Sequence, residues 1–247
     1  MQSQPLPPLT QRLPMLDAAR GLALVAMIIF HGSWNLDNFG FTDLGVVTKP
    51  GWAWFAKGIA GSFLMLSGLS LVLADAAGHS NQQKLQRIGK IAAAAALVSI
   101  GTYIVFPRSF VYFGILHHLA LASLLALPLL RTHWSINMAI AMLVVGLDMF
   151  VSFQFADTRW LAWTGLATTP PFTNDYVPLM PWFAVFLCGI PLGRQILKRK
   201  WIQAPLAKQP SLAKPLVFMG RHSLIIYLLH QPILFGAAYG VYQLIQP

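Results

Sequence analysis

The stretch LDAARGLALVAMIIFHGSWNLDNFG, residues 16–40, places two ionisable side chains, Arg20 and His31, at the ends of a long apolar run. A membrane-spanning helix needs roughly 17–25 mostly apolar residues. Ionisable side chains within such a run are costly, so they usually face the interior of a helix bundle and mark a functional site. This stretch therefore predicts a membrane helix with one functional polar face.

Arg20 and His31 are expected to lie on the same face of that helix. Their separation corresponds to about 16–17 Å of helix rise and to about 20° in azimuth. A long, thin, anionic ligand could then have its charged end at Arg20 and its reacting end near His31. The alternative is structural: Arg20 is an ordinary membrane anchor that pairs with Asp17, and His31 is a satisfied interhelical hydrogen bonder.

The composition indicates lipid-facing helices throughout the chain. Hydrophobic residues make up 56% of the 247 residues, charged residues make up 10%, and the mean hydropathy is +0.61. A soluble domain carries roughly 25% charged residues, so this chain could not cover a globule with solvated side chains. All seven acidic residues are Asp, and the Glu that solvated helix faces normally use is missing.

The sequence predicts an all-α fold, a polytopic membrane helical bundle of about seven spans. A further segment, residues 158–169, is too short to cross and is expected to be interfacial or re-entrant. The small-residue stretch GIAGSFLMLSG, residues 58–68, indicates close helix packing. The predicted spans are residues 17–34, 52–74, 88–106, 111–130, 134–153, 178–197 and 222–244.

The distribution of basic residues predicts the orientation. With the N-terminus in the cytoplasm, all but four of the 17 basic residues fall on the inner side, the exceptions being Lys49, Lys57, Arg108 and Arg159. This asymmetry follows the positive-inside rule. It predicts a multi-pass inner (plasma) membrane protein with its C-terminus outside, and it explains the net charge of +10 without nucleic acid as a partner.

The chain is expected to hold one domain. Residues 1–15 are rich in Pro and Gln without an apolar core, which predicts a disordered cytoplasmic N-terminus rather than a signal peptide. Residues 16–247 are expected to form a single transmembrane domain. Cys188 is alone, which excludes an intrachain disulfide. The oligomeric state is left open, with a homo-oligomer among the alternatives.

Polar residues near the outer ends of the predicted spans outline an outward-facing pocket. His117 lies about two turns below the outer end of the fourth span, near the expected depth of His31, while its neighbour His118 points about 100° away. For Asp37, Asp175 and His222 taken singly, interfacial solvation is the competing explanation. Trp34 and Trp182 fit an interfacial belt, with a sugar site as the alternative. The expected pocket comprises His31, Asn35, Asp37, His117 and Asp175.

A second polar group is expected at the inner side. Arg20, Arg221 and His222 would surround an inner mouth, and His230 would stand near mid-membrane. The histidine spacings do not form a metal-ligand pattern, so no metal is expected. Nucleotide-binding glycine motifs and nucleophile elbows are also absent from the sequence.

Four ordered motifs resemble a known family. LDAARGLALVAMIIFH (residues 16–31) resembles the arginine-x10-histidine motif of the transmembrane acyltransferase superfamily, which includes the acyltransferase-three family. YFGILHHLALASLL (112–125), NDYVPLMPWFAVFLCG (174–189) and FMGRHSLIIYLLHQPIL (218–234) look like the bacterial branch related to the heparan-α-glucosaminide N-acetyltransferase catalytic domain. The resemblance extends from about Arg12 to Gly236.

The resemblance implies acyl transfer across the membrane from cytoplasmic acyl-CoA, acetyl-CoA above all. The acceptor would be an outward-facing amine or hydroxyl of an envelope glycan or glycolipid. Arg20 and His31 match the arginine and the catalytic histidine of the motif, so His31 is expected to be the general base, with a covalent acyl-histidine as the less favoured variant. Members often carry an Asp shortly after that histidine, whereas this chain has Asn35, with Asp37 two residues later.

The other candidate residues follow from this assignment. We assign acyl-CoA binding to Arg20 and Arg221, because guanidinium groups bind phosphate well, and to His230 as well. Asp175 and His117 are candidates to support His31, and which residue orients it stays open. The expected acceptor-binding residues are Trp34, Asn35, Asp37 and Trp182.

Two other classes of protein fit the same sequence. In a transporter or permease for a small solute or glycan, the intramembrane histidines would form a proton relay. In a non-catalytic membrane scaffold, neither acyl-CoA nor an acceptor would bind.

Overall fold

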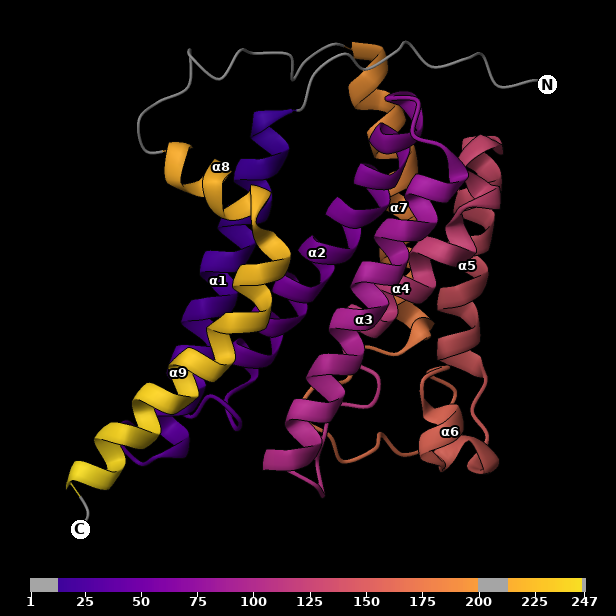
Figure 1. Cartoon of the computed structure of the whole chain (residues 1–247). Helices are drawn as coiled ribbons and strands as arrows, with labels where there is room; N and C mark the ends of the chain where they lie inside the picture. Colours follow the sequence, from indigo (N-terminus) through magenta and orange to yellow (C-terminus); the bar gives the residue numbers. More distant parts are fainter. Residues whose placement is uncertain (1–12, 200–212, 246–247) are drawn as a thin grey trace. The chain divides into compact units, whose positions relative to one another are not determined.

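The computed structural model describes residues 13–199 and 213–245, and this part of the chain is all-α, as predicted. Figure 1 shows its elements. The α-helices are α1 (Pro14–Asn38), α2 (Pro50–Ala76), α3 (Asn81–Val105), α4 (Ile115–Ala126), α5 (Trp134–Phe150), α6 (Arg159–Ala162), α7 (Leu179–Arg199), α8 (Ala213–Arg221) and α9 (Ser223–Ile245). Two 3₁₀ helices are η1 (Pro128–Arg131) and η2 (Gln154–Asp157).

Each predicted span contains one apolar helix, so the membrane helical bundle is confirmed. Within the described residues, α1, α2, α3, α7 and α9 are long and apolar enough to cross a bilayer. The other two apolar helices, α4 and α5, are shorter. The predicted segment 111–130 holds a helix of only 12 residues, because Gly114 is extended at its N-cap and Pro128 starts a 3₁₀ turn.

Two further segments differ in detail from the sequence-based expectation. In the predicted interfacial segment 158–169, only Arg159–Ala162 is α-helical. The short helix α8 precedes the last predicted span, residues 222–244, as a separate element. Residues 1–12 of the predicted N-terminus and residues 200–212 lie outside the described residues.

The described residues fall into two compact units, each of which is considered by itself. We call residues 13–63 together with 213–245 the terminal unit, and residues 64–199 the central unit. Helix α2 contributes its first part to the terminal unit and its second part to the central unit. The expectation of a single domain over residues 16–247 stays a prediction.

In the terminal unit, α8 and α9 both pack against α1 (Figure 1). Leu24, Met27 and Ile59 form its buried apolar centre, against which Met219 and Ile226 pack. The backbones of α1 and α8 approach closely through glycines. A Cβ atom on Gly21 would lie 2.0 Å from the carbonyl oxygen of Leu216, far inside van der Waals contact. Small residues at such crossings allow two helices to pack without a side chain between them.

In the central unit, α3 packs on α4, and α7 packs on both α4 and α5. Helices α2 and α7 also meet through glycines. A Cβ atom on Gly68 would lie 2.1 Å from the carbonyl oxygen of Phe186, and one on Gly189 would lie 2.2 Å from that of Met65. The close packing predicted for GIAGSFLMLSG is therefore confirmed at Gly68. Gly58, at the start of that stretch, has open space around it instead.

Candidate functional site

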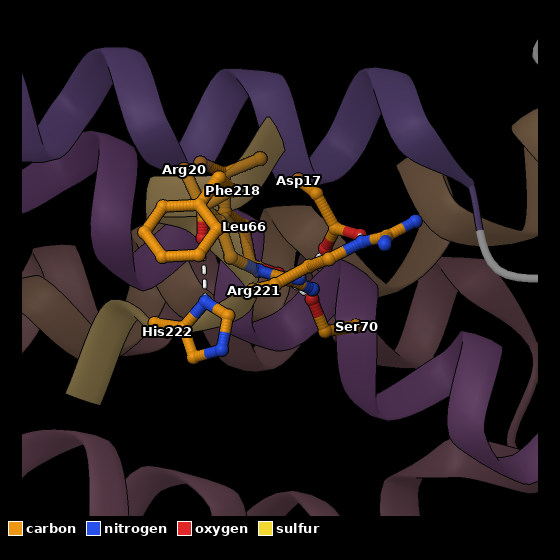
Figure 2. Close-up of polar contacts among 7 residues, drawn as sticks. All are labelled: Asp17, Arg20, Leu66, Ser70, Phe218, Arg221 and His222. Atoms are coloured by element: carbon orange, nitrogen blue, oxygen red, sulfur yellow. Dashed lines mark hydrogen bonds and ion pairs between the residues drawn. The ribbon is translucent and has the colours of Figure 1, made fainter. Parts of the chain in front are cut away.

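The polar residues of the terminal unit gather at two places along α1. The first, which we call the Asp17 cluster, comprises Asp17, Arg20 and Arg221 (Figure 2). Arg20 Nη1 donates to Asp17 Oδ1 at 2.6 Å, and Arg221 Nε lies 3.6 Å from Asp17 Oδ2. The pairing of Arg20 with Asp17, given above as an alternative, is therefore confirmed. The cluster carries two cations and one anion.

The Asp17 cluster is accessible on its cationic side only. The side chain of Asp17 is 7% exposed, whereas those of Arg20 and Arg221 are 23% and 37% exposed. The arrangement places two partly exposed guanidinium groups beside one buried carboxylate. The next residue, His222, is also drawn in Figure 2. Its Nδ1 donates a hydrogen bond to the carbonyl oxygen of Phe218.

The second group, which we call the histidine–amide cluster, comprises His31 and Asn35 on α1 with His230 and Gln231 on α9. The imidazole rings of His31 and His230 lie 4.9 Å apart between centroids, with 56° between their planes. His230 Nδ1 bonds the carbonyl oxygen of Tyr227, which can only accept, so Nδ1 carries the proton. In neutral His230, Nε2 is therefore unprotonated and can accept a hydrogen bond.

Two buried atoms of this cluster have no hydrogen-bond partner among the described residues. One is His230 Nε2, and the other is Asn35 Oδ1. The amide nitrogen of Asn35 does have a partner, since it donates to Gln231 Oε1 at 3.4 Å. Leaving a buried polar group unpaired costs about 1–3 kcal/mol, so such groups in a native protein call for an explanation. Two such atoms in one cluster make it a candidate site, because each of them can accept a hydrogen bond.

Asp37, predicted to lie in the outer pocket, is bound to the loop that follows α1. Its carboxylate accepts from the hydroxyl of Thr42 at 2.7 Å, the N–H of Leu44 at 2.8 Å and the N–H of Val46 at 2.9 Å. These three bonds fix the path of the chain after α1. The aromatic candidate on the same helix, Trp34, is partly buried.

In the central unit, His117 is fully engaged in fixing the start of α4. Its Nδ1 accepts the N–H of Gly114 at 3.2 Å, so its Nε2 carries the proton and donates to Ser99 Oγ at 3.1 Å. Ser99 Oγ in turn donates to the carbonyl oxygen of Val111 at 2.6 Å. Both ring nitrogens thus have structural partners.

Asp175 also contributes to the start of α4. Its Oδ2 accepts the N–H of Ile115, the first residue of the helix, at 2.9 Å. Burial raises the pKa of this carboxyl group, and the hydrogen bond from Ile115 acts in the opposite direction. A Cβ atom at Gly114 would lie 2.1 Å from Asp175 Oδ2, so the carboxylate needs a glycine at that position.

His118, which is not among the predicted site residues, is the fully buried member of the histidine pair. It is 0% exposed, and its Nδ1 donates to the carbonyl oxygens of Val177 at 3.2 Å and Pro178 at 3.1 Å. Its Nε2 has no partner among the described residues. The adjacent His-His pair was the available signal, because two neighbours on a helix must face different surroundings.

The structure brings together some of the predicted site residues. It joins Arg20 to Arg221 through Asp17. It sets His230, which was expected near mid-membrane and assigned to acyl-CoA, against His31. The predicted outer pocket divides between the units: His31, Asn35 and Asp37 belong to the terminal unit, and His117 and Asp175 to the central unit with Trp182. The grouping of these five residues into one pocket stays a prediction.

Comparison with known protein families identifies the chain's relationship. Residues 12–232 match the model of the family described as heparan-alpha-glucosaminide N-acetyltransferase, catalytic. The match includes the residues of both clusters, and it confirms the resemblance that the four motifs indicated. No curated protein and no solved structure matches the chain.

Proposed function

Since the chain belongs to the heparan-alpha-glucosaminide N-acetyltransferase catalytic family and is a multi-pass membrane protein, we propose that it transfers an acetyl group across the membrane. The donor is cytoplasmic acetyl-CoA, and the acceptor is an outward-facing sugar amine or hydroxyl of an envelope glycan or glycolipid. The protein resides in the inner membrane with its N-terminus in the cytoplasm. The observation that carries this proposal is the presence of two polar clusters along α1, one cationic and one built around two histidines.

The two clusters suit the two ends of acetyl-CoA. Arg20 and His31 are separated by about 16–17 Å along α1, on one face of the helix. The phosphates of the nucleotide would bind at the partly exposed guanidinium groups of Arg20 and Arg221 through charge-assisted hydrogen bonds. The pantetheine arm would then extend along α1 and place the thioester beside the histidine–amide cluster.

His31 is the general base in this proposal. It takes the proton of the acceptor's amine or hydroxyl while that nitrogen or oxygen forms a bond to the thioester carbonyl carbon. The carbon–sulfur bond then breaks, and the CoA thiolate leaves and takes the proton from the His31 imidazolium. The products are the acetylated acceptor and CoA thiol, and His31 returns to its neutral form.

The acceptor sugar would be held by polar atoms near His31. Asn35 lies one turn after His31, and its buried Oδ1 is available to a hydroxyl or amine hydrogen of the sugar. Trp34 would supply an apolar face for the ring. Asp37 shapes the loop beside this site. The roles expected of Trp182, His117 and Asp175, which belong to the central unit, stay predictions from the sequence.

Reconstitution of the full chain tests this proposal. Purified protein in phosphatidylcholine vesicles is supplied with radiolabelled acetyl-CoA on one side and methyl α-glucosaminide on the other. We expect labelled N-acetyl sugar from the wild type and a rate at least about 100-fold lower from His31→Ala, the scale of general-base catalysis. His79→Ala, which alters an exposed loop histidine, is the matched control.

Three outcomes would contradict the proposal. Transfer by His31→Ala at the wild-type rate, in protein with unchanged helical content and elution volume, would remove His31 from the reaction. Accumulation of the unmodified sugar in vesicles without acetyl-CoA would indicate a transporter. Failure of the wild type to bind either acetyl-CoA or the sugar would indicate a scaffold.

A further inference from the structure

We propose that His230 is the positioning residue of His31. In this role the neutral imidazole of His230 accepts a hydrogen bond from the His31 ring and stabilises the imidazolium that forms during transfer. The inference rests on the proposed function, and it replaces the earlier assignment of His230 to acyl-CoA. It also answers which residue orients His31 in a chain that has Asn35 where a carboxylate is often found.

The first support is the fixed tautomer of His230. The carbonyl oxygen of Tyr227 holds the proton on Nδ1, which leaves Nε2 as an acceptor. Nε2 is buried and has no partner among the described residues, while the ring of His31 lies 4.9 Å away between centroids. A bond between the two rings can close when His31 becomes protonated, because catalytic hydrogen bonds often tighten only in the reacting complex.

The second support is that the acidic residues of the terminal unit are committed elsewhere. Asp17 binds Arg20 and Arg221, about 20 Å along α1 from His31. Asp37 is bound to three donors of its loop, and Asp43 is exposed in the same loop. Within this unit, the acceptor beside His31 is therefore a second histidine rather than a carboxylate.

The physical reason for a histidine here is the cost of charge inside the membrane. A carboxylate beside His31 would be a permanent charge in an apolar bundle, whereas neutral His230 introduces none until the reaction begins. While His31 is an imidazolium, the lone pair on His230 Nε2 accepts a hydrogen bond from its N–H and so stabilises the cation. The charge disappears again when the CoA thiolate takes the proton.

The vesicle assay with acetyl-CoA and methyl α-glucosaminide separates this role from acyl-CoA binding. We expect His230→Ala to lower kcat at least about 30-fold and to leave the KM for acetyl-CoA unchanged, because the lost interaction belongs to the transition state. His230→Gln, which keeps an acceptor near the position of Nε2, should retain more activity than His230→Ala. Added imidazole should restore part of the activity of His230→Ala.

A double variant supplies the decisive comparison. If His230 acts through His31, then His31→Ala/His230→Ala is no slower than His31→Ala alone, because residues that act as a unit are not additive. Multiplied losses would overturn the inference, as would a raised KM for acetyl-CoA with unchanged kcat. If His230→Ala does not fold, His230→Gln decides: kcat at the wild-type level with lost acetyl-CoA affinity would reject the role. An inactive wild type would instead reject the proposed function itself.

Discussion

Gly220 of α8 lies so close to Asp17 of α1 that a Cβ atom at Gly220 would stand 1.7 Å from the carbonyl oxygen of Asp17. The next residue, Arg221, thereby reaches the carboxylate of Asp17, which also holds Arg20. The backbone contact and the cationic cluster are thus one feature. A helix crossing that only glycine permits decides which two arginines are neighbours.

Filling the space at Gly220 should separate these helices. We expect Gly220→Val to lower the free energy of unfolding by at least about 1–3 kcal/mol, the usual cost of overpacking, and to weaken acetyl-CoA binding as Arg221 moves away. Gly236→Val is the control, because a Cβ atom at Gly236 would meet open space. Fluorescence-monitored thermal unfolding measures the effect, and equal Tm values for the two variants would contradict it.

Removal of Arg20 should act on the donor rather than on the acceptor. We expect Arg20→Ala to raise the KM for acetyl-CoA at least about tenfold, since a charge-assisted hydrogen bond contributes about 1.5–3 kcal/mol. The KM for methyl α-glucosaminide should not change. Arg20→Lys should recover binding only in part, because an ammonium lacks the bidentate geometry of guanidinium. An unchanged KM for acetyl-CoA in Arg20→Ala would remove Arg20 from the donor site.

The ion pair between Lys84 and Asp75 predicts a stability effect in the central unit. Lys84 Nζ bonds Asp75 Oδ1, and the side chain of Lys84 is only 3% exposed. We expect Lys84→Met to lower the free energy of unfolding by about 1.5–3 kcal/mol, since it removes a charge-assisted hydrogen bond from a partly buried carboxylate. The double variant Lys84→Met/Asp75→Leu should recover most of this loss. Thermal unfolding of both variants checks the prediction, and a double variant less stable than the single one would refute it.

Two loop carboxyl groups should give stability a pH dependence of opposite sign. Burial raises the pKa of Asp175, so its folded form holds the proton more tightly than the unfolded chain. Its contribution is therefore full below the ordinary Asp pKa of about 3.9 and is lost as the pH rises through the raised value. Asn at position 175 keeps an acceptor for the N–H of Ile115 but does not titrate. We therefore expect the Tm of Asp175→Asn not to decrease as the pH rises through this range.

Asp157 is the counterpart. Its hydrogen bond from the hydroxyl of Thr168 is the main cause of a lowered pKa, with the N–H groups of Thr168 and Thr169 adding to it. Its contribution is present above the ordinary pKa and is lost as the pH falls through the lowered value. Asp157→Asn should therefore lower Tm at neutral pH and match the wild type in acid. The same sign of pH dependence for both carboxyl groups would contradict this account.

Much of the candidate site was predictable where it depended on one helix. The positions of Arg20, His31 and Asn35 on α1 follow from their spacing, because a helix fixes which residues share a face. The engagement of Asp37, His117 and Asp175 with backbone N–H groups was not predictable from the same reasoning. These bonds depend on loop paths and helix starts, which hydropathy does not specify.

The sequence alone determined that this chain is a bundle of apolar helices with an arginine and a histidine on one face of the first. Hydropathy and periodicity are local properties, so a short stretch is enough to read them. The sequence also predicted Arg221 near Arg20, but only the tertiary structure decided that both arginines share Asp17 and that His230 lies against His31. Asn35 and Gln231, whose side chains meet in the same cluster, are 196 residues apart. Such pairings depend on how α8 and α9 pack on α1, and this packing is determined by the glycines and the side-chain shapes at the contacts.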